Sequence, residues 1–273
     1  MHLVRHPADL TAASGGALVP TMGALHEGHL ALMRRARALA QPVVISIFVN
    51  PAQFGPGEDY QRYPRTMEAD LEAAEAAGVE VVFAPEVETM YPPEHRPPVG
   101  PLPDVATRPG LEEAHRPGHF AGVCQVVARL LDLVKPSVAI FGEKDYQQLL
   151  VVEAMVQAER DRWPGLRIER HPTVREADGL AASSRNARLE PSVRDRALGL
   201  FRALEAAQDA PETAEETMQR VLAEHDLGVD YAVVRDARTL EPIETPQQPA
   251  RALVAARLGD VRLIDNVEVI SDQ

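Results

Sequence analysis

The sequence predicts an α/β fold in which a doubly wound parallel sheet of the Rossmann-like kind is followed by a smaller C-terminal α+β domain. The first observation is a series of short apolar runs rich in β-branched residues, which is typical of strands covered on both faces. The second is that helical patterns lie between these runs, and such alternation implies right-handed βαβ units. The third is a change of character after about residue 174, where helices are followed by strands in hairpin order.

The strands of the parallel sheet are expected where these apolar runs occur. Valine and isoleucine dominate three of the runs, as expected for strands that are buried on both sides. A fifth candidate, at Leu166–Val174, is more polar. The other four predicted strands are Ala17–Val19, Val43–Val49, Val79–Phe83 and Val138–Phe141.

Three helices are predicted in the first domain. One begins after Gly28, where apolar residues recur at helical spacing up to residue 40. Thr66 can cap a second, which has acidic residues in its first turn and ends at Gly78. The clearest apolar stripe, from Phe120 to Val134, predicts a third. The segment from Ala84 to Pro117 is rich in proline and has no periodicity, so we expect a surface excursion there.

The second part of the chain is predicted to contain helices and then antiparallel strands. A helix is expected over 190–207, and Thr213-Ala214-Glu215-Glu216 is a capping box that opens another. Gly259-Asp260 predicts a two-residue hairpin turn. We therefore predict two domains, residues 1–176 and 177–273. The strands expected in the second are Val229–Val234, Arg251–Leu258 and Val261–Ile270.

Composition and charge narrow the class of function. A net charge of -13 argues against a nucleic-acid partner, although a local basic pocket can still hold an anionic substrate. No apolar run approaches the roughly 20 residues that cross a bilayer, and the first residues lack the apolar stretch of a signal peptide. We expect a soluble cytoplasmic protein with small-molecule substrates. Cys124 is the only cysteine, which excludes an intrachain disulfide and a cysteine-based zinc site.

The first candidate site is the stretch from Pro20 to His29, which follows a predicted strand and leads into a helix. A helix N-terminus favours phosphate because its N–H groups are unpaired and carry partial positive charge. Gly23 and Gly28 would let the backbone approach a ligand closely, and His26 and His29 can both donate hydrogen bonds to phosphate oxygens. The alternatives are exposed polar histidines or half of a metal site. A metal is not expected, because no third ligand stands at a telling spacing.

A second candidate site lies where the strand around Ser46 ends. Asn50 and Gln53 can form directional hydrogen bonds with hydroxyls and a carboxylate, at the sheet edge where doubly wound folds bind ligands. A plain polar strand end is the alternative. The following segment, 55–65, is polar and rich in turns, which is typical of a surface loop.

Charged groups stand at two more helix starts. Arg116 and His119 precede the most apolar helix. Lys144, one of only two lysines, follows a buried strand and a glycine turn, where it can neutralise phosphate charge. Asp145 beside it can accept hydrogen bonds from ribose hydroxyls. Simple capping and a charged turn are the alternatives for these two segments.

The last candidate site is Ser183-Ser184-Arg185-Asn186, near the predicted domain boundary. Two hydroxyls and a guanidinium can hold a triphosphate, because Arg favours bidentate phosphate contacts. The alternative is a turn closed by its own serine side chains.

Together these segments resemble the pantothenate synthetase (pantoate–β-alanine ligase) family of the nucleotidyltransferase superfamily, whose signature is His-x-Gly-His. The matching strings span residues 20 to 188, and the C-terminal third matches only in broad character. One departure is Ala182, where the family commonly has Met or Leu. The strings are Pro20-Thr21-Met22-Gly23-Ala24-Leu25-His26-Glu27-Gly28-His29, Phe48-Val49-Asn50-Pro51-x-Gln53-Phe54, Gly142-Glu143-Lys144-Asp145-x-Gln147-Gln148 and Ser183-Ser184-Arg185.

The resemblance implies a role for each matched position. It implies that His29, His26, Lys144 and Arg185 are catalytic, with His29 donating a proton to the leaving group. It implies that segment 55–65 is a gate, with Tyr63 and Arg65 facing inward. It implies that pantoate is bound by Gln53, Gln148, Asn50, Arg116 and His119. ATP is implied at Met22, Gly23, Ala24, Leu25, His26, Glu27, Gly28, His29, Gly142, Glu143, Lys144, Asp145, Val174, Ala182, Ser183, Ser184 and Arg185.

The implied reaction joins pantoate to β-alanine through a pantoyl adenylate, consumes ATP with Mg²⁺ and releases AMP and pyrophosphate. A homodimer is implied by the resemblance alone. Two alternatives stay open. Another nucleotidyltransferase, acting on a phosphorylated cofactor precursor, would keep His-x-Gly-His but lack the pair Gln53 and Gln148. A catalytically silent nucleotide-binding module would be favoured by loss of Lys144 or of either histidine, and all three are present. The sequence leaves open whether the Pro-rich segment 92–109 is ordered.

Overall fold

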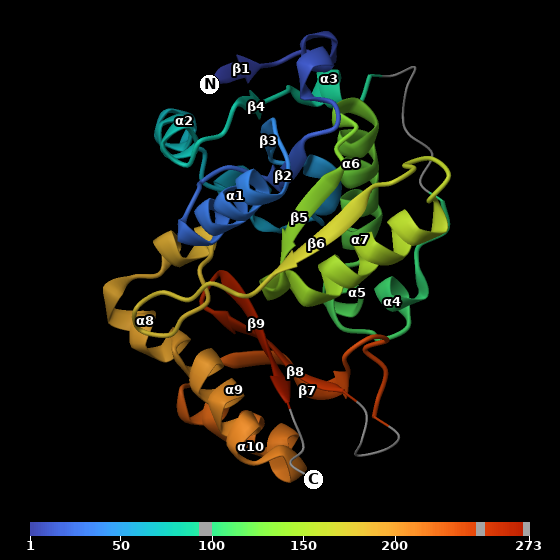
Figure 1. Ribbon diagram of the computed structural model, residues 1–273. Coiled ribbons are helices and arrows are strands. Elements are labelled where there is room, and N and C mark those ends of the chain that lie inside the picture. Colours follow the sequence, from blue (N-terminus) through green and yellow to red (C-terminus); the bar gives the residue numbers. More distant parts are fainter. Residues whose placement is uncertain (93–99, 244–248, 270–273) are drawn as a thin grey trace.

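The computed structural model describes residues 1–92, 100–243 and 249–269. Its larger sheet has six parallel strands in the order β1-β4-β3-β2-β5-β6 (Figure 1). All five predicted strands of this sheet are confirmed. The sixth, β1, was missed because it is a three-residue edge strand with one buried residue. The strands are β1 (His2–Val4), β2 (Ala17–Thr21), β3 (Val43–Ile47), β4 (Val81–Phe83), β5 (Val138–Gly142) and β6 (Arg167–His171).

Helices cover both faces of this sheet, which explains its apolar strands. Successive side chains of a strand point to opposite faces. Leu18 therefore packs into the core beneath α6 and α7, and its neighbour Val19 packs into the core beneath α1 and α2. Figure 1 shows α1 and α6 on opposite sides of the central strands. The helices are α1 (Glu27–Leu39), α2 (Met67–Ala76), α6 (His119–Val134) and α7 (Tyr146–Ala158).

The order of the strands indicates which edge of the sheet can bind ligands. β2 lies between β3 and β5, so the chain runs outward in one direction from β2 and then in the other. In doubly wound sheets, the carboxyl ends of the strands at such a switch point open a crevice for ligands. The ends of β2 and β5 are Thr21 and Gly142, and both lead into predicted site segments.

The segment before α6 is only partly the surface excursion that its sequence predicts. It contains three single-turn helices, α3 (Val87–Met90), α4 (Asp104–Thr107) and α5 (Glu112–His115). Met90 and Ala106 are fully buried in the core beneath α6 and α7. Helices of one turn bury too few side chains to show a period, so the sequence pattern could not reveal them. Part of the Pro-rich segment 92–109, residues 93–99, lies outside the described residues.

The C-terminal part forms a three-stranded antiparallel sheet with helices against one face (Figure 1). The hairpin at Gly259-Asp260 is confirmed, because Leu258 pairs with Val261. The helix predicted over 190–207 is divided into two at Leu198. The elements are α8 (Pro191–Ala197), α9 (Gly199–Asp209), α10 (Ala214–Glu224), β7 (Gly228–Asp236), β8 (Ala250–Leu258) and β9 (Val261–Val269).

The capping box predicted before α10 does not form. The helix starts as expected, but the Thr213 side chain makes no capping hydrogen bond to the backbone. Glu215 instead accepts a hydrogen bond from the Val234 N–H at 2.7 Å, so it ties the helix to β7.

The other face of the small sheet is turned toward the first domain. Leu253 of β8 is 4% exposed and packs into the core that contains α6 and α7, and Tyr231 of β7 packs against the same core. The small sheet therefore covers the edge at which β5 ends. The domain boundary near residue 176 stays a prediction. No helix within the described ranges is long and apolar enough to cross a membrane.

Candidate active site

Two histidines cap the helix that follows β2. The backbone N–H of Gly28 donates to His26 Nδ1 at 3.1 Å, and the N–H of His26 donates to His29 Nδ1 at 3.4 Å. Because each Nδ1 accepts, each neutral ring carries its proton on Nε2. Gly28 is required here, since a Cβ at this position would lie 2.8 Å from His26 Cε1. The pair therefore offers two N–H donors, with ring centroids 4.0 Å apart.

Burial keeps both rings uncharged at neutral pH. It lowers the pKa of His26 to about 4, with a further lowering from the charge of Lys144. Burial, followed by the charges of His26 and Lys144, lowers the pKa of His29 well below its usual value. Desolvation disfavours the charged imidazolium, and a nearby cation does the same. The histidines thus present hydrogen-bond donors rather than fixed positive charge.

Asp70 holds the turn between β2 and α1. Its carboxylate is 2% exposed and accepts from the N–H groups of Ala24 at 2.9 Å and Leu25 at 2.8 Å. These N–H groups are therefore used within the turn, and the predicted contact of Ala24 and Leu25 with ATP stays a prediction. Met22, His26, Gly28 and His29 line a cavity at this turn, and Gly23, Ala24, Leu25 and Glu27 are not among its lining residues.

An amide pair lies where β3 ends. Gln53 lines the same cavity and is 8% exposed. Its Oε1 accepts from Asn50 Nδ2 at 3.2 Å, and Asn50 Nδ2 also donates to the Gly122 carbonyl at 3.0 Å. The hydroxyl of Tyr91 donates to Asn50 Oδ1 at 2.9 Å. Asn50 is 1% exposed, so it lies behind Gln53 and orients it. Its predicted contact with substrate stays a prediction.

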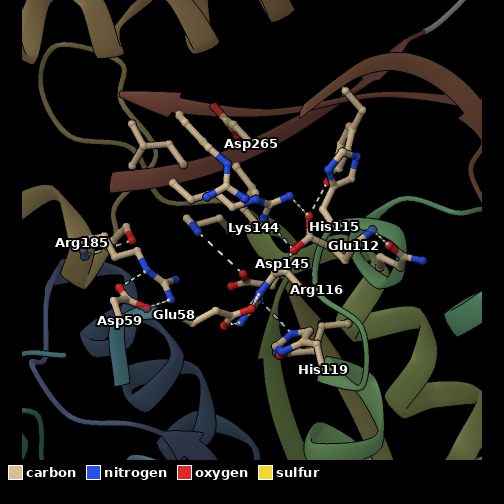
Figure 2. Close-up of a pocket in the computed structure, with 18 of the residues that line it drawn as sticks. Glu58, Asp59, Glu112, His115, Arg116, His119, Lys144, Asp145, Arg185 and Asp265 are labelled. Atoms are coloured by element: carbon tan, nitrogen blue, oxygen red, sulfur yellow. Dashed lines mark hydrogen bonds and ion pairs between the residues drawn. The ribbon is translucent and has the colours of Figure 1, made fainter. Parts of the chain in front are cut away.

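Arg116 and His119 meet at the start of α6. Arg116 Nη1 lies 3.1 Å from His119 Nε2, and His119 Nδ1 lies 2.9 Å from the Gln53 carbonyl oxygen. Burial, followed by the charge of Arg116, lowers the pKa of His119 to about 4. Arg116 also pairs with Glu58 at 2.9 Å (Figure 2). Both predicted residues therefore lie at the cavity, beside Gln53.

The turn after β5 carries Lys144 and Asp145 into the site. Lys144 Nζ lies 3.7 Å from Asp145 Oδ1, and Figure 2 shows this pair between Arg185 and Arg116. Gln148, half-buried at the start of α7, lines the cavity with them. The carboxylate of Glu143 accepts from Arg251 at 3.2 Å, and the predicted contact of Glu143 with ATP stays a prediction.

The serine segment closes the cavity from the far side. Ser183 Oγ accepts from the N–H of Arg185 at 3.3 Å, and Ser184 Oγ donates to the Ala24 carbonyl at 3.0 Å. Ser183 therefore forms the turn closed by its own side chain that was the alternative for this segment. Arg185 pairs with Asp59 through two hydrogen bonds. Val174 and Ala182 complete this wall.

The loop 55–65 lies over the site. Glu58 and Asp59 anchor it to Arg116 and Arg185 on two sides of the cavity (Figure 2). Tyr63, at 6% exposure, faces inward and lines the cavity as expected. Arg65 instead donates to the backbone carbonyl of Tyr63 at 3.0 Å, so its charge serves the loop itself.

Two adjoining cavities make up the whole site. The first contains the histidine pair, and the second lies under the small sheet. They share seven lining residues, so they lie side by side. The shared residues are Arg116, His119, Lys144, Asp145, Gln148, Ser183 and Arg185.

Sequence comparison gives the family. The chain matches the family described as pantoate-beta-alanine ligase over residues 3–268. The chain belongs to the pantoate–β-alanine ligase family. It is 50% identical over 263 residues to the pantothenate synthetase of Myxococcus xanthus, which covers 93% of this chain and 88% of that relative. It is 47% identical to that of Paramagnetospirillum magneticum, over 98% of both chains.

Solved structures of pantoate–β-alanine ligases have the same fold. Pantothenate synthetase from Thermus thermophilus superposes with a TM-score of 0.91 at 46% identity, over 99% of this chain and 100% of that one. The Francisella tularensis ligase, described as complexed with beta-gamma ATP and beta-alanine, has a TM-score of 0.81 at 30% identity and covers 98% and 97%. The resemblance inferred from the motifs and the predicted α/β fold class are confirmed, and the chain is an enzyme of this family.

Proposed function

We propose that the chain condenses (R)-pantoate with β-alanine to give pantothenate, using ATP and passing through a pantoyl adenylate. One observation supports this most: side chains suited to bind phosphate and side chains with a carboxamide line a single cavity. The side chains suited to phosphate are His26, His29, Lys144 and Arg185, and the carboxamides are those of Gln53 and Gln148.

In the first step, a carboxylate oxygen of pantoate attacks the α-phosphorus of ATP, and the bond to pyrophosphate breaks. Negative charge gathers on phosphoryl oxygens, so positioning and electrostatics do most of the work. The Nε2–H groups of His26 and His29 and the ammonium of Lys144 suit this task. Because the ring of His29 is neutral at neutral pH, we assign to it the donation of an Nε2–H hydrogen bond to the oxygens of the departing pyrophosphate, in place of the proton transfer that the resemblance implies. Gln53 and Gln148 hold pantoate.

In the second step, the amine of β-alanine attacks the acyl carbon of the adenylate. The amide bond forms, the acyl–phosphate bond breaks and AMP leaves with the electron pair, while the attacking nitrogen releases a proton to solvent. Water would destroy the adenylate, so the site must be covered. The anchors of loop 55–65, Glu58 on Arg116 and Asp59 on Arg185, suit such a gate.

Mg²⁺ is proposed to arrive with the triphosphate, held by phosphate oxygens and water. Asp145 is the one carboxylate among the described residues that line the histidine cavity. No group of three or more His, Cys, Asp or Glu within the described ranges is arranged to hold a resident metal. This lining fits an ion shared with the nucleotide, and Asp145 is the carboxylate that would be available to hold it.

Incubation with ATP, pantoate and β-alanine tests the proposal. AMP and an amide product are expected, and omission of β-alanine should leave a tightly held adenylate. A nucleotidyltransferase acting on a phosphorylated precursor would instead release a nucleotide adduct. A silent nucleotide-binding module would consume nothing, and either result would refute the proposed reaction.

His29→Ala tests the assignment of His29 to the departing pyrophosphate. The adenylation rate, followed by pyrophosphate release, should fall on the order of 10²-fold or more. Arg34→Ala is the matched control, because this side chain lies exposed on the same helix. Near-normal adenylation by the His29 variant would remove the residue from the mechanism.

We also propose that the enzyme is a homodimer that acts in the cytoplasm, with domains at 1–176 and 177–273. Dimerisation rests on the family resemblance. Light scattering at micromolar concentration tests it, and a monomer mass would refute it.

A further inference from the structure

A residue of the C-terminal sheet holds the turn that carries Lys144. Asn266 lies on β9 and is 3% exposed. Its Nδ2 donates to the carbonyl oxygens of both Glu143 and Lys144, each at 2.9 Å. A carboxamide nitrogen has two N–H donors, so this turn takes both.

The carboxamide of Asn266 is itself held in place. Its Oδ1 accepts from Arg251 Nε at 2.6 Å, which fixes which end of the amide faces the turn. Arg251 also donates to Glu143 at 3.2 Å and lies over the Tyr146 ring with its guanidinium carbon 3.8 Å from the centroid. Residues of β8 and β9 therefore contact the backbone of the turn, the Glu143 side chain and the Tyr146 ring that follows.

The neighbouring residue on β9 holds a second wall of the site. Asp265 accepts from Arg175 at 2.6 Å and 3.1 Å, and it lies directly above Lys144 in Figure 2. Arg175 follows Val174, which lines the histidine cavity. Asp265 and Asn266, which are consecutive on β9, therefore hold two segments that line the histidine cavity: the segment at Val174 and the turn at Lys144.

Lys144 stands in a short turn between β5 and α7. It belongs to a single 3-10 turn, Glu143–Asp145, that has no side-chain cap. Its ammonium has an ion pair with Asp145 at 3.7 Å, and its flexible stem allows many rotamers. Where the backbone of Lys144 is placed therefore decides where its charge can reach.

We propose that Asn266 is a positioning residue for Lys144, through which docking of the C-terminal sheet completes the triphosphate site. This inference rests on the proposed function, because that function places Lys144 on the triphosphate. Asn266 lines the adjoining cavity under the small sheet, and it acts on Lys144 through the two carbonyl groups.

A double-mutant cycle tests this role, with pyrophosphate release measured in single turnovers. Asn266→Ala should lower the adenylation rate about tenfold while Lys144 is present. In the Lys144→Ala background it should cause no further loss, because the group it positions is gone. The pantoate KM should stay unchanged. A general structural defect would instead lower the rate by the same factor in both backgrounds and overturn the proposal.

Two further variants sharpen the test. Asn266→Asp keeps the shape and the acceptor for Arg251, but its second oxygen faces two carbonyl groups and should repel them. It should lose at least as much activity as Asn266→Ala, and it replaces that variant in the cycle if the alanine protein does not fold. Glu268→Gln, exposed on the same strand, should keep the wild-type rate.

The outcomes separate this inference from the proposed function. If the wild-type enzyme forms no AMP from ATP and pantoate with β-alanine, the proposed function fails and this inference falls with it. If the wild type is active and both Asn266 variants match it, the positioning role alone is wrong.

Discussion

Asp59 and Arg185 form a two-bond ion pair across the mouth of the site. Arg185 Nε donates to Asp59 Oδ2 at 2.9 Å, and Arg185 Nη2 donates to Oδ1 at 3.1 Å (Figure 2). Arg188 adds a third contact to the same carboxylate at 2.7 Å. Although burial alone would raise it, the hydrogen bond and charges of these two arginines lower the pKa of Asp59. A permanent negative charge therefore accompanies the guanidinium proposed to bind triphosphate.

Asp59→Asn should tighten ATP binding, because the carboxylate and the triphosphate compete for Arg185. We expect the dissociation constant of a non-hydrolysable ATP analogue to fall about fivefold at low ionic strength. Asp260→Asn is the control, since Asp260 meets Arg188 and Arg62. Weaker binding by the Asp59 variant would show that this carboxylate supports Arg185 rather than opposing its ligand.

Gln53→Ala should raise the KM for pantoate at least about tenfold more than the KM for ATP, because it removes a buried hydrogen-bonding group from one substrate. Steady-state kinetics with each substrate varied in turn gives both constants. Equal changes would contradict the pantoate assignment.

Asn50→Ala should produce the same pattern in weaker form, since Asn50 reaches the cavity through Gln53. The double variant should lose no more than Gln53→Ala alone. Independent, multiplying losses would mean that Asn50 contacts the substrate itself.

The sequence predicts those parts of the fold that depend on residues close together in the chain. The runs at Val43–Val49 and Val138–Phe141 are apolar on both faces, so their burial between two layers of helices follows from composition. His26 and His29 could be placed at a helix start because the glycines and histidines that form the cap are consecutive. Several motif residues that line this cavity follow the ends of β2, β3 and β5, whereas Arg116 and His119 stand at the junction of α5 and α6.

What the sequence could not show are the partners that reach the site from far along the chain. Asp70 holds the N–H groups of Ala24 and Leu25 from 46 and 45 positions away. Asn266 holds Lys144 from 122 positions away. The only local sign of Asp70 was an acidic residue in the first turn of a helix, which helix capping already explains. Such contacts depend on how elements pack, which periodicity does not encode.

Glu112→Ala should strongly destabilise the protein, because Glu112 ties the first domain to the small sheet. Its carboxylate is 5% exposed and accepts from Arg262 at 2.7 Å and 2.8 Å and from the Tyr231 hydroxyl at 2.8 Å. Although burial alone would raise it, these bonds lower the pKa of Glu112 to about 2. The variant leaves the Tyr231 hydroxyl and two donors of Arg262 without their acceptor, while Arg262 keeps its pair with Asp230 at 2.7 Å. Breaking a buried pair typically costs about 3–5 kcal/mol, and the remaining pair places this loss at the lower end, about 3 kcal/mol.

Urea unfolding gives the free energy of unfolding for this comparison. Glu224→Ala is the matched control, since Glu224 pairs with Arg220 on the surface of α10 with both side chains more than half exposed. Exposed pairs contribute only ~0–1 kcal/mol. Losses of similar size in the two variants would mean that the Glu112 cluster does not join the domains.

His119 should make the protein less stable in mild acid. Burial, then the charge of Arg116, lowers the pKa of its native ring to about 4 from an ordinary value of 6.5. Between these pH values the unfolded chain binds a proton that the folded protein does not, so the free energy of unfolding falls as the pH falls. The full effect is about 3 kcal/mol, present above pH 6.5 and lost by pH 4.

His119→Gln should remove this contribution while keeping a side chain that can donate to the Gln53 carbonyl. Urea unfolding at pH 8 measures what the substitution costs in hydrogen bonding and packing alone, because neither state is protonated there. The same measurement at pH 5 adds the proton, so the gap between wild type and variant should narrow or reverse at the lower pH. A gap of equal size at both pH values would mean that the His119 ring takes up a proton in the folded protein as readily as in the unfolded chain. That result would contradict a neutral His119 held between Arg116 and Gln53.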